Sequence, residues 1–90
     1  MSNVDTTLNG RGNEHREFKH HAVISQDMKI TMHNCTNWDN LDYDMQEALD
    51  MIQHKIARIL NGNPKHIDSW HDIQGYARLV ERRLIEEKKD

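Results

Sequence analysis

The chain has 90 residues, of which 36% are hydrophobic and 30% are charged, and its formal net charge is −3 with the seven histidines neutral. One cysteine excludes an intrachain disulfide, and no apolar stretch approaches the roughly 20 residues that span a bilayer. The acidic balance, with Lys and Arg scattered, argues against duplex nucleic acid as a partner. We therefore expect one small cytoplasmic domain, away from membranes.

The N-terminal residues 1–12 are polar, include two glycines and lack periodicity, so a flexible segment is expected there. A first helix is predicted over about 13–33. Its apolar face is expected to consist of side chains spaced three and four apart: Phe18, His21, Ile24, Met28 and Met32. Residues 34–40, rich in Asn, predict a loop in which Trp38 covers the helices.

A second helix is predicted from Asp42 or Asp44, where Asp44 and Glu47 are spaced as in a capping box, to the stop signal at 61–64. Its apolar stripe is Met45, Leu49, Ile52, Ile56 and Ile59. A third helix is predicted to begin near Asp68 as N-cap. Its stripe is Trp70, Ile73, Ala77, Val80 and Leu84.

Three helices with short connections and no strand-like alternation predict an all-α, three-helix bundle over residues 13–90. The second and third helices are expected to form an antiparallel hairpin. Because the apolar fraction allows only a thin core, self-association would bury more surface, and we expect a homo-oligomer.

The antiparallel hairpin would bring cations of the second helix close to carboxylates of the third helix. Lys55 and Arg58 lie on one line of the second helix, beside the apolar stripe, while Asp68 and Asp72 lie on one line of the third. Tyr76 adds a hydroxyl one turn beyond Asp72. These residues predict either a pocket that holds phosphate or carboxylate, or a salt-bridge network that fixes the hairpin register. Gly75 in mid-helix indicates a close backbone approach.

The histidines raise the question of a metal site. Asp50 and His54 are four residues apart, and a second group surrounds the start of the third helix: His66, Asp68, His71 and Asp72. The chain has no His-Glu-x-x-His motif and no cysteine pair, so solvated histidines and no metal are expected. Cys35, Ser25 and Ser69 lack a base in a recognisable triad, and no catalytic residue or cofactor is predicted.

The segment from Glu47 to Arg58, followed by Asp68 to Ala77, resembles small phage and prophage domains of unknown function. Their pattern is Lys-x-x-Arg, a loop, then Asp-x-x-x-Asp-x-x-Gly-Tyr-Ala, with an upstream Arg-Gly, aromatic and histidine matched by Arg11, Gly12, Phe18 and His21. The resemblance covers about residues 11–84. It extends distantly to nucleotide-modification-associated domains and to MazG-like all-α nucleoside-triphosphate pyrophosphohydrolases.

The MazG-like enzymes hold Mg²⁺ with acidic helices, whereas this chain carries Lys55 and Arg58 at the equivalent place. Two cations cannot ligate Mg²⁺, so that activity does not transfer with the resemblance.

Three functions compete. The first is a phage-type accessory protein that binds a nucleotide or another phosphate-containing ligand through Lys55 and Arg58, oriented by Asp72 and Tyr76. The second is an interaction module that modulates a host protein through apolar surface at its methionines: Met28, Met32, Met45 and Met51. The third is a minimal pyrophosphohydrolase with Mg²⁺ on carboxylates: Glu47, Asp50, Asp68 and Asp72. Binding is favoured over catalysis.

Overall fold

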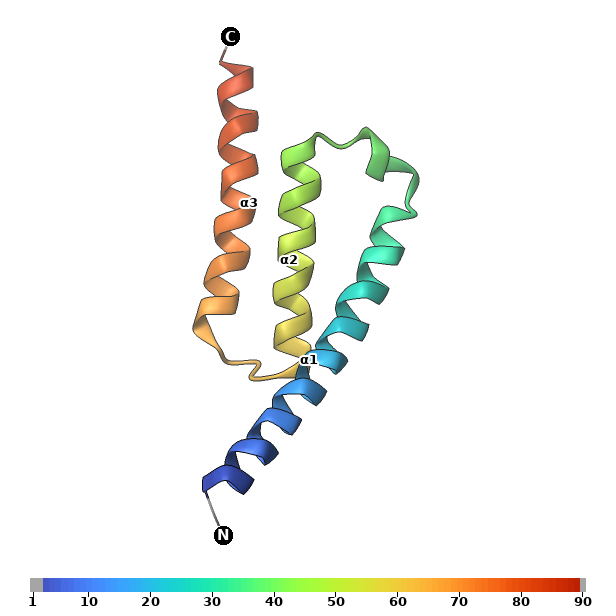
Figure 1. Cartoon of the computed structure of the whole chain (residues 1–90). Coiled ribbons are helices and arrows are strands. Elements are labelled where there is room, and N and C mark those ends of the chain that lie inside the picture. The colour runs from blue at the N-terminus through green and yellow to red at the C-terminus, as the bar shows by residue number, and fades with distance from the viewer. Residues whose placement is uncertain (1–2, 90) are drawn as a thin grey trace.

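The computed structural model describes the backbone of residues 3–89 and the side chains of residues 17–89. Its elements are α1 (Asn3–His33), the short 3₁₀ helix η1 (Thr36–Asn40), α2 (Tyr43–Asn61) and α3 (Ile67–Lys88) (Figure 1). The described backbone contains no strand, and α2 and α3 form a closely packed antiparallel hairpin. The predicted all-α bundle of three helices is therefore confirmed.

The first helix differs from its prediction in length and in the residues that it buries. It begins at Asn3 rather than near Asn13, while the predicted flexibility of 1–12 falls on residues whose side chains lie outside the description and stays a prediction. Among the described side chains of α1, His21 and Ser25 are buried, and Phe18 is 70% exposed. Phe18 was expected on the buried face, but the face that meets α2 is largely polar.

The start of α2 is stabilised differently from a capping box. Asp42 is the N-cap but its side chain makes no cap hydrogen bond, and Asp44 accepts a hydrogen bond from its neighbour, the Met45 backbone N–H, at 3.0 Å. Both carboxylates instead bind the guanidinium of Arg83 on α3. The predicted Asp44–Glu47 box is thus replaced by a long-range ion pair, which the local spacing cannot reveal.

The turn between α2 and α3 also departs from the predicted caps. Gly62 has φ −137° rather than a left-handed φ, although a Cβ there would lie 3.1 Å from the Arg58 carbonyl oxygen. His66 is the N-cap of α3, so Asp68 falls inside its first turn. Trp70 donates its indole N–H to the Pro64 carbonyl at 2.8 Å and so ties the turn to α3.

Helix α2 lies between the other two helices and packs against both (Figure 1). On one side, Gln53 exchanges hydrogen bonds of 3.2 and 3.1 Å with Ser25 of α1. On the other side, Lys55 pairs with Asp72 of α3 at 3.0 Å. Two residues rotate an α-helix by roughly 200°, so the contacts of Gln53 and Lys55 point in nearly opposite directions. The three helices therefore form a layer with α2 in its centre.

The interior of this layer is small and polar. Among the described side chains, the buried hydrophobic residues are Ala48 and Ala57, and the buried polar residues are His21, Ser25, Gln53 and Ser69. Leu49, Ile56 and Trp70, expected in the core, are 40%, 36% and 52% exposed. The predicted stripes form, but part of each faces out of the layer, because neighbours flank α2 on two sides and leave a third side open.

In the described part of the chain, none of the helices has both the length and the apolar character that crossing a membrane requires.

Candidate functional site

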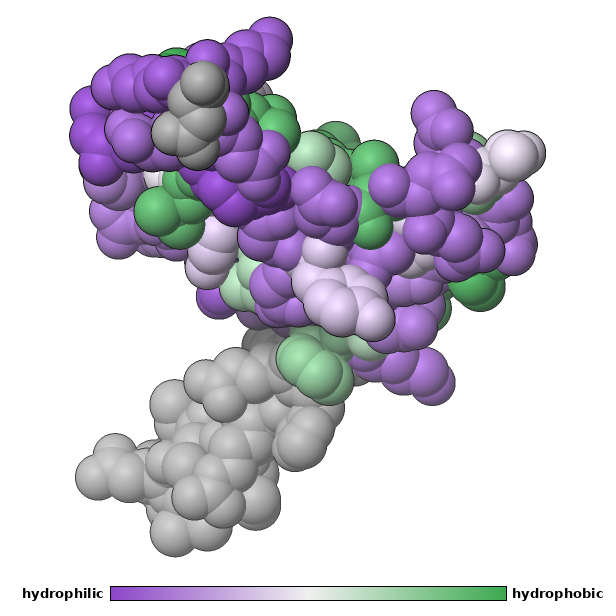
Figure 2. Space-filling view, turned by 90° about the horizontal axis from the view of Figure 1, so that it is seen from above, coloured by the Kyte–Doolittle hydropathy of each residue, from purple (hydrophilic) through white to green (hydrophobic). Residues whose placement is uncertain are grey.

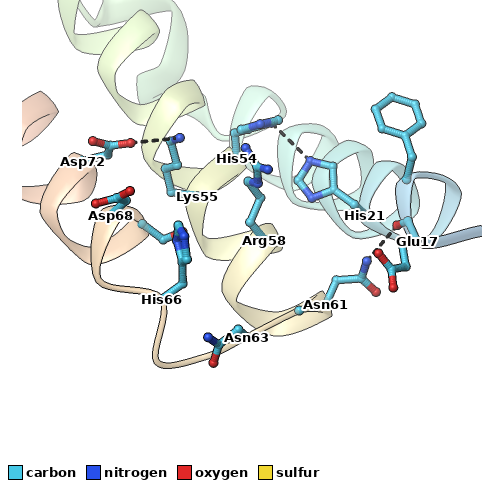
Figure 3. Close-up of a pocket in the computed structure, with 13 residues that line it drawn as sticks. Glu17, His21, His54, Lys55, Arg58, Asn61, Asn63, His66, Asp68 and Asp72 are labelled. Carbon is cyan, nitrogen blue, oxygen red and sulfur yellow. Dashed lines mark hydrogen bonds and ion pairs between the residues drawn. The ribbon is translucent and has the colours of Figure 1, made fainter. Parts of the chain in front are cut away.

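A cavity of about 690 Å³ opens where α1, the end of α2 and the start of α3 come together. Figure 3 shows α3 on one side of the cavity, α1 on the other and α2 between them. The side chains around it are mainly polar or charged. The lining residues are Glu17, Phe18, His21, His54, Lys55, Arg58, Asn61, Gly62, Asn63, His66, Asp68, Ser69 and Asp72.

Four of the five predicted ligand residues lie around this cavity: Lys55, Arg58, Asp68 and Asp72. Tyr76 is the exception, since it is half-buried one turn further along α3 and does not line the cavity. The antiparallel packing of α2 and α3 brings the four together by placing the end of one helix beside the start of the other.

Lys55 is held by an ion pair across the hairpin. Its Nζ lies 3.0 Å from Asp72 Oδ2, and its side chain is 16% exposed against 39% for Asp72. A contact between two helices that is partly shielded from water fixes their register. The salt-bridge interpretation is therefore realised for Lys55 and Asp72, at the wall of the same cavity that the ligand interpretation requires.

Arg58 is placed differently. It lines the cavity, is exposed to solvent, and has no ion-pair partner among the side chains of residues 17–89. The predicted meeting of Arg58 with Asp68 or Asp72 is therefore not found. A guanidinium offers five N–H donors in a planar fork, which suits a phosphate or carboxylate. Arg58 is the cation best placed to bind an anionic group in the cavity.

Two histidines complete the wall on the side of α1. His21 Nε2 and His54 Nδ1 are 3.3 Å apart, and the rings meet edge to face at a centroid distance of 4.6 Å. Desolvation, followed by the positive charge of Arg58, lowers the pKa of His21. Desolvation also lowers the pKa of His54, with further contributions first from His21 and then from Arg58, Lys55 and Lys29. The lowered pKa values favour the neutral form of both rings, beside the positive charges of Arg58 and Lys55.

The sequence alone missed this histidine pair. His21 was placed correctly on a buried face of the first helix, and His54 was assigned to solvent together with Asp50. In the structure Asp50 instead accepts from His33 Nε2 at 2.8 Å, and His54 turns toward His21. In the sequence, the position of His54 one residue before Lys55 indicates that it lies near the predicted site. Pairing it with His21 requires the relative placement of α1 and α2.

The rim of the cavity is fixed by hydrogen bonds to the backbone. The Asn61 side chain donates to the Glu17 carbonyl oxygen at 2.8 Å, which joins the end of α2 to α1 (Figure 3). Asn63 Oδ1 accepts from the Lys65 backbone N–H at 3.0 Å and shapes the turn. These contacts hold the lining residues in place before any ligand binds, which lowers the entropy lost on binding.

The structure also locates the residues considered for metal binding. His66 and Asp68 line the cavity with Asp72, whereas His71 is exposed and outside it. Within residues 17–89, no three His, Cys, Asp or Glu side chains are grouped in a way that could hold a metal ion. Asp50 lies with His33, away from the carboxylates of α3.

The turn after α1 is held by local contacts. Cys35 is exposed. Trp38, which was expected to cover the helices, is half-buried and stacks on His33 at the end of α1, with the ring centroids 4.2 Å apart.

Comparison of the chain with protein-family models, with curated proteins and with solved structures gives no match.

Proposed function

We propose that the protein acts by binding, and that the cavity takes a nucleotide or another phosphate-containing ligand. The observation that carries the proposal is Arg58, an exposed guanidinium that lines the cavity and has no carboxylate partner among the described side chains. A binding role in a phage or prophage setting is what the resemblance of the hairpin motif implies.

The composition of the cavity fits this class of ligand. Its volume of about 690 Å³ lies within the range of roughly 300–1,000 Å³ typical of small-molecule sites. Arg58 would bind phosphate oxygens with two parallel N–H donors, and Lys55 would add a second positive charge close by. The lowered pKa values of His21 and His54 favour their neutral forms, which can donate or accept hydrogen bonds without repelling the cations.

The carboxylates give the site a second recognition element. Asp68 and Asp72 lie on the α3 side of the cavity, opposite His21 of α1 (Figure 3). A free carboxylate oxygen accepts hydrogen bonds from sugar hydroxyls or from a base N–H, and it repels a bare polyanion. We therefore favour a nucleoside phosphate with few charges over inorganic polyphosphate.

Neither alternative gains comparable support. For the host-protein module, the four methionines named as contact residues are all half-buried. For the pyrophosphohydrolase, Asp72 is paired with Lys55 and Asp50 with His33, so these two carboxylates are engaged in separate contacts.

The test is a thermal-shift titration of the purified protein with nucleoside mono-, di- and triphosphates and with inorganic phosphate. A ligand present at about 100 times its dissociation constant adds roughly 2.7 kcal/mol of stability, which raises Tm by several degrees in a domain of this size. We expect Arg58→Ala to remove the rise while Tm without ligand stays near that of the wild type. Arg78→Ala, an exposed arginine of α3 outside the cavity, is the matched control and should respond like the wild type.

Arg58 is preferred to Lys55 for this test because Lys55 also joins the hairpin. Lys55→Ala would lower the basal Tm as well as the affinity, and the two effects would be mixed. The absence of a shift with every compound, or an equal shift in wild type and Arg58→Ala, would contradict the proposal.

A further inference from the structure

One side of the helix layer carries a continuous set of large apolar side chains. On α2, Ile56 follows Lys55 directly and is therefore turned by roughly 100° from the side that meets α3. Leu49 and Leu60 lie within about 40° of Ile56 around the helix. Arg58 is turned by roughly 200° from Ile56, so the cavity and these side chains lie on opposite faces of α2.

The same separation holds on α3. Asp68 and Asp72 line the cavity, and Trp70 is turned by roughly 160° from each of them around the helix. Ala77 lies seven residues after Trp70, within about 20° of it around the helix, and extends the same line. On α3 the side away from the cavity therefore carries Trp70 and Ala77 beside the apolar side of α2, and Glu81 follows them at the edge of this surface. We call this shared surface the apolar face: Leu49, Ile56, Leu60, Trp70 and Ala77.

These side chains are open to solvent in the single chain. Leu49, Ile56, Leu60 and Trp70 are 40%, 36%, 67% and 52% exposed. Figure 2 shows hydrophobic residues reaching the surface of the molecule between the polar ones. No charged residue interrupts the set on α2 at positions 45, 49, 52, 56 and 60, which read Met, Leu, Ile, Ile and Leu.

The fully buried interior of the single chain is small. Its hydrophobic members among the described residues are two alanines, Ala48 and Ala57. Domains are generally built from two packed layers of secondary structure that enclose one hydrophobic core. This chain supplies one layer, with its large apolar side chains on one side of it and without a second layer in the described residues to cover them.

We propose that the apolar face is the interface with a second copy of this chain, so that two layers enclose one shared core. A fully exposed large side chain presents on the order of 150–250 Å², so the exposed fractions above, with the half-buried neighbours on the same stripes, give roughly 500 Å² of apolar surface. A stable dimer covers about 800 Å² on each partner, with an apolar centre and a polar rim. The apolar face has the size of such a centre.

A second copy fits this surface better than an unrelated partner does. The five side chains of the apolar face are uncharged, so two copies meet there without like-charge repulsion, and a two-fold axis lets each apolar stripe pack against its counterpart. The arrangement also leaves the cavity open, because the cavity lies on the opposite face of the layer. The proposal is independent of which ligand binds at Arg58.

The experiment measures the mass of the wild type in solution by light scattering after size-exclusion chromatography, over a wide concentration range. We expect twice the 10.7 kDa of the chain. Ile56→Glu, at the centre of the apolar face, should shift the mass toward one chain. Leu79→Glu is the matched control, because Leu79 is 65% exposed but lies about one turn from Tyr76 on the cavity side of α3, and it should remain dimeric.

If Ile56→Glu does not fold, the wild type still decides the question. A dimer whose halves are stabilised by association has a Tm that rises with protein concentration, whereas the Tm of a monomer does not. A wild type that remains a monomer at every concentration, or an oligomer that a folded Ile56→Glu variant leaves intact, would overturn the proposal. A monomer that binds another protein through the apolar face would overturn it as well.

Discussion

The buried pair of Ser25 and Gln53 allows a quantitative test of how α1 is attached to α2. Gln53 is 2% exposed. Its amide oxygen accepts a hydrogen bond from the Ser25 hydroxyl at 3.2 Å, and its amide nitrogen donates one to the same hydroxyl at 3.1 Å. Ser25→Ala removes both hydrogen bonds at once and leaves the buried Gln53 amide unsatisfied. Such a loss costs about 1–3 kcal/mol of unfolding free energy. For a domain of this length, each kcal/mol lowers Tm by roughly 4–8 °C.

The double variant separates this penalty from simple loss of packing. Gln53→Met keeps a long, flexible side chain but removes the amide, so that Ser25→Ala combined with Gln53→Met leaves two apolar side chains in contact. Replacing both members of a buried polar pair by apolar groups is close to neutral. We therefore expect the double variant to be more stable than Ser25→Ala alone, with a coupling energy of about 1–2 kcal/mol.

Urea denaturation followed by far-UV circular dichroism, at one fixed protein concentration, measures these differences. Ser69→Ala is a suitable comparison, because Ser69 is also buried but the one side-chain hydrogen bond that it makes in the described residues is a long one, 3.5 Å to His66. A Ser25→Ala variant within about 0.5 kcal/mol of the wild type would refute the reasoning, since an unsatisfied buried amide costs more than that. Strict additivity of the two substitutions would refute it equally.

Three further predictions concern other parts of the molecule. Gly75→Ala should raise the unfolding free energy by about 1 kcal/mol in urea denaturation, because a Cβ at Gly75 meets no atom within 4 Å and alanine favours the helix. The pKa values of His21 and His54 are lowered in the folded state, so the unfolded state binds more protons. The contribution of the two neutral histidines to the unfolding free energy is therefore fully present above the unfolded pKa of 6.5 and is lost as the pH falls below it. His54→Gln should reduce this slope in a Tm-against-pH series, while the exposed His71→Gln should leave it unchanged. Arg83→Ala should lower Tm at low salt and less so in 1 M NaCl, because its ion pairs are at the surface and are screened; an equal loss at both salt concentrations would contradict this account.

The hydrophobic periodicity predicted the helices, but it could not predict where their apolar stripes would point. The stripe of α2 was correct as a pattern, and Leu49 and Ile56 nevertheless remain partly exposed, because periodicity reports a shared face and not what covers it. Gly75 illustrates a related error: mid-helix glycine suggested a close backbone approach, whereas the position is open. The sequence does not distinguish a glycine that is required by close packing from one that is not.

The candidate site was predicted as far as the helical hairpin alone determines it. Lys55 and Asp72 meet because antiparallel helices joined by a short turn bring such positions into register. Arg58 lines the same cavity but forms neither predicted ion pair, since it is turned by roughly 60° from Lys55 around α2. The contribution of α1, above all His21, depends on a contact 33 residues apart in the sequence and has no local signal.

The central position of α2 has a consequence for the order in which the molecule opens. The contacts of α1 and of α3 lie on opposite sides of α2, so either outer helix can detach while α2 keeps one of its two neighbours. Local opening follows such units, and amide hydrogens exchange at a rate set by the least costly opening that exposes them. The amides of α2 should therefore be the slowest to exchange. Loosening of α1 should expose the histidine pair while the hairpin of α2 and α3, with the Lys55–Asp72 pair, stays assembled.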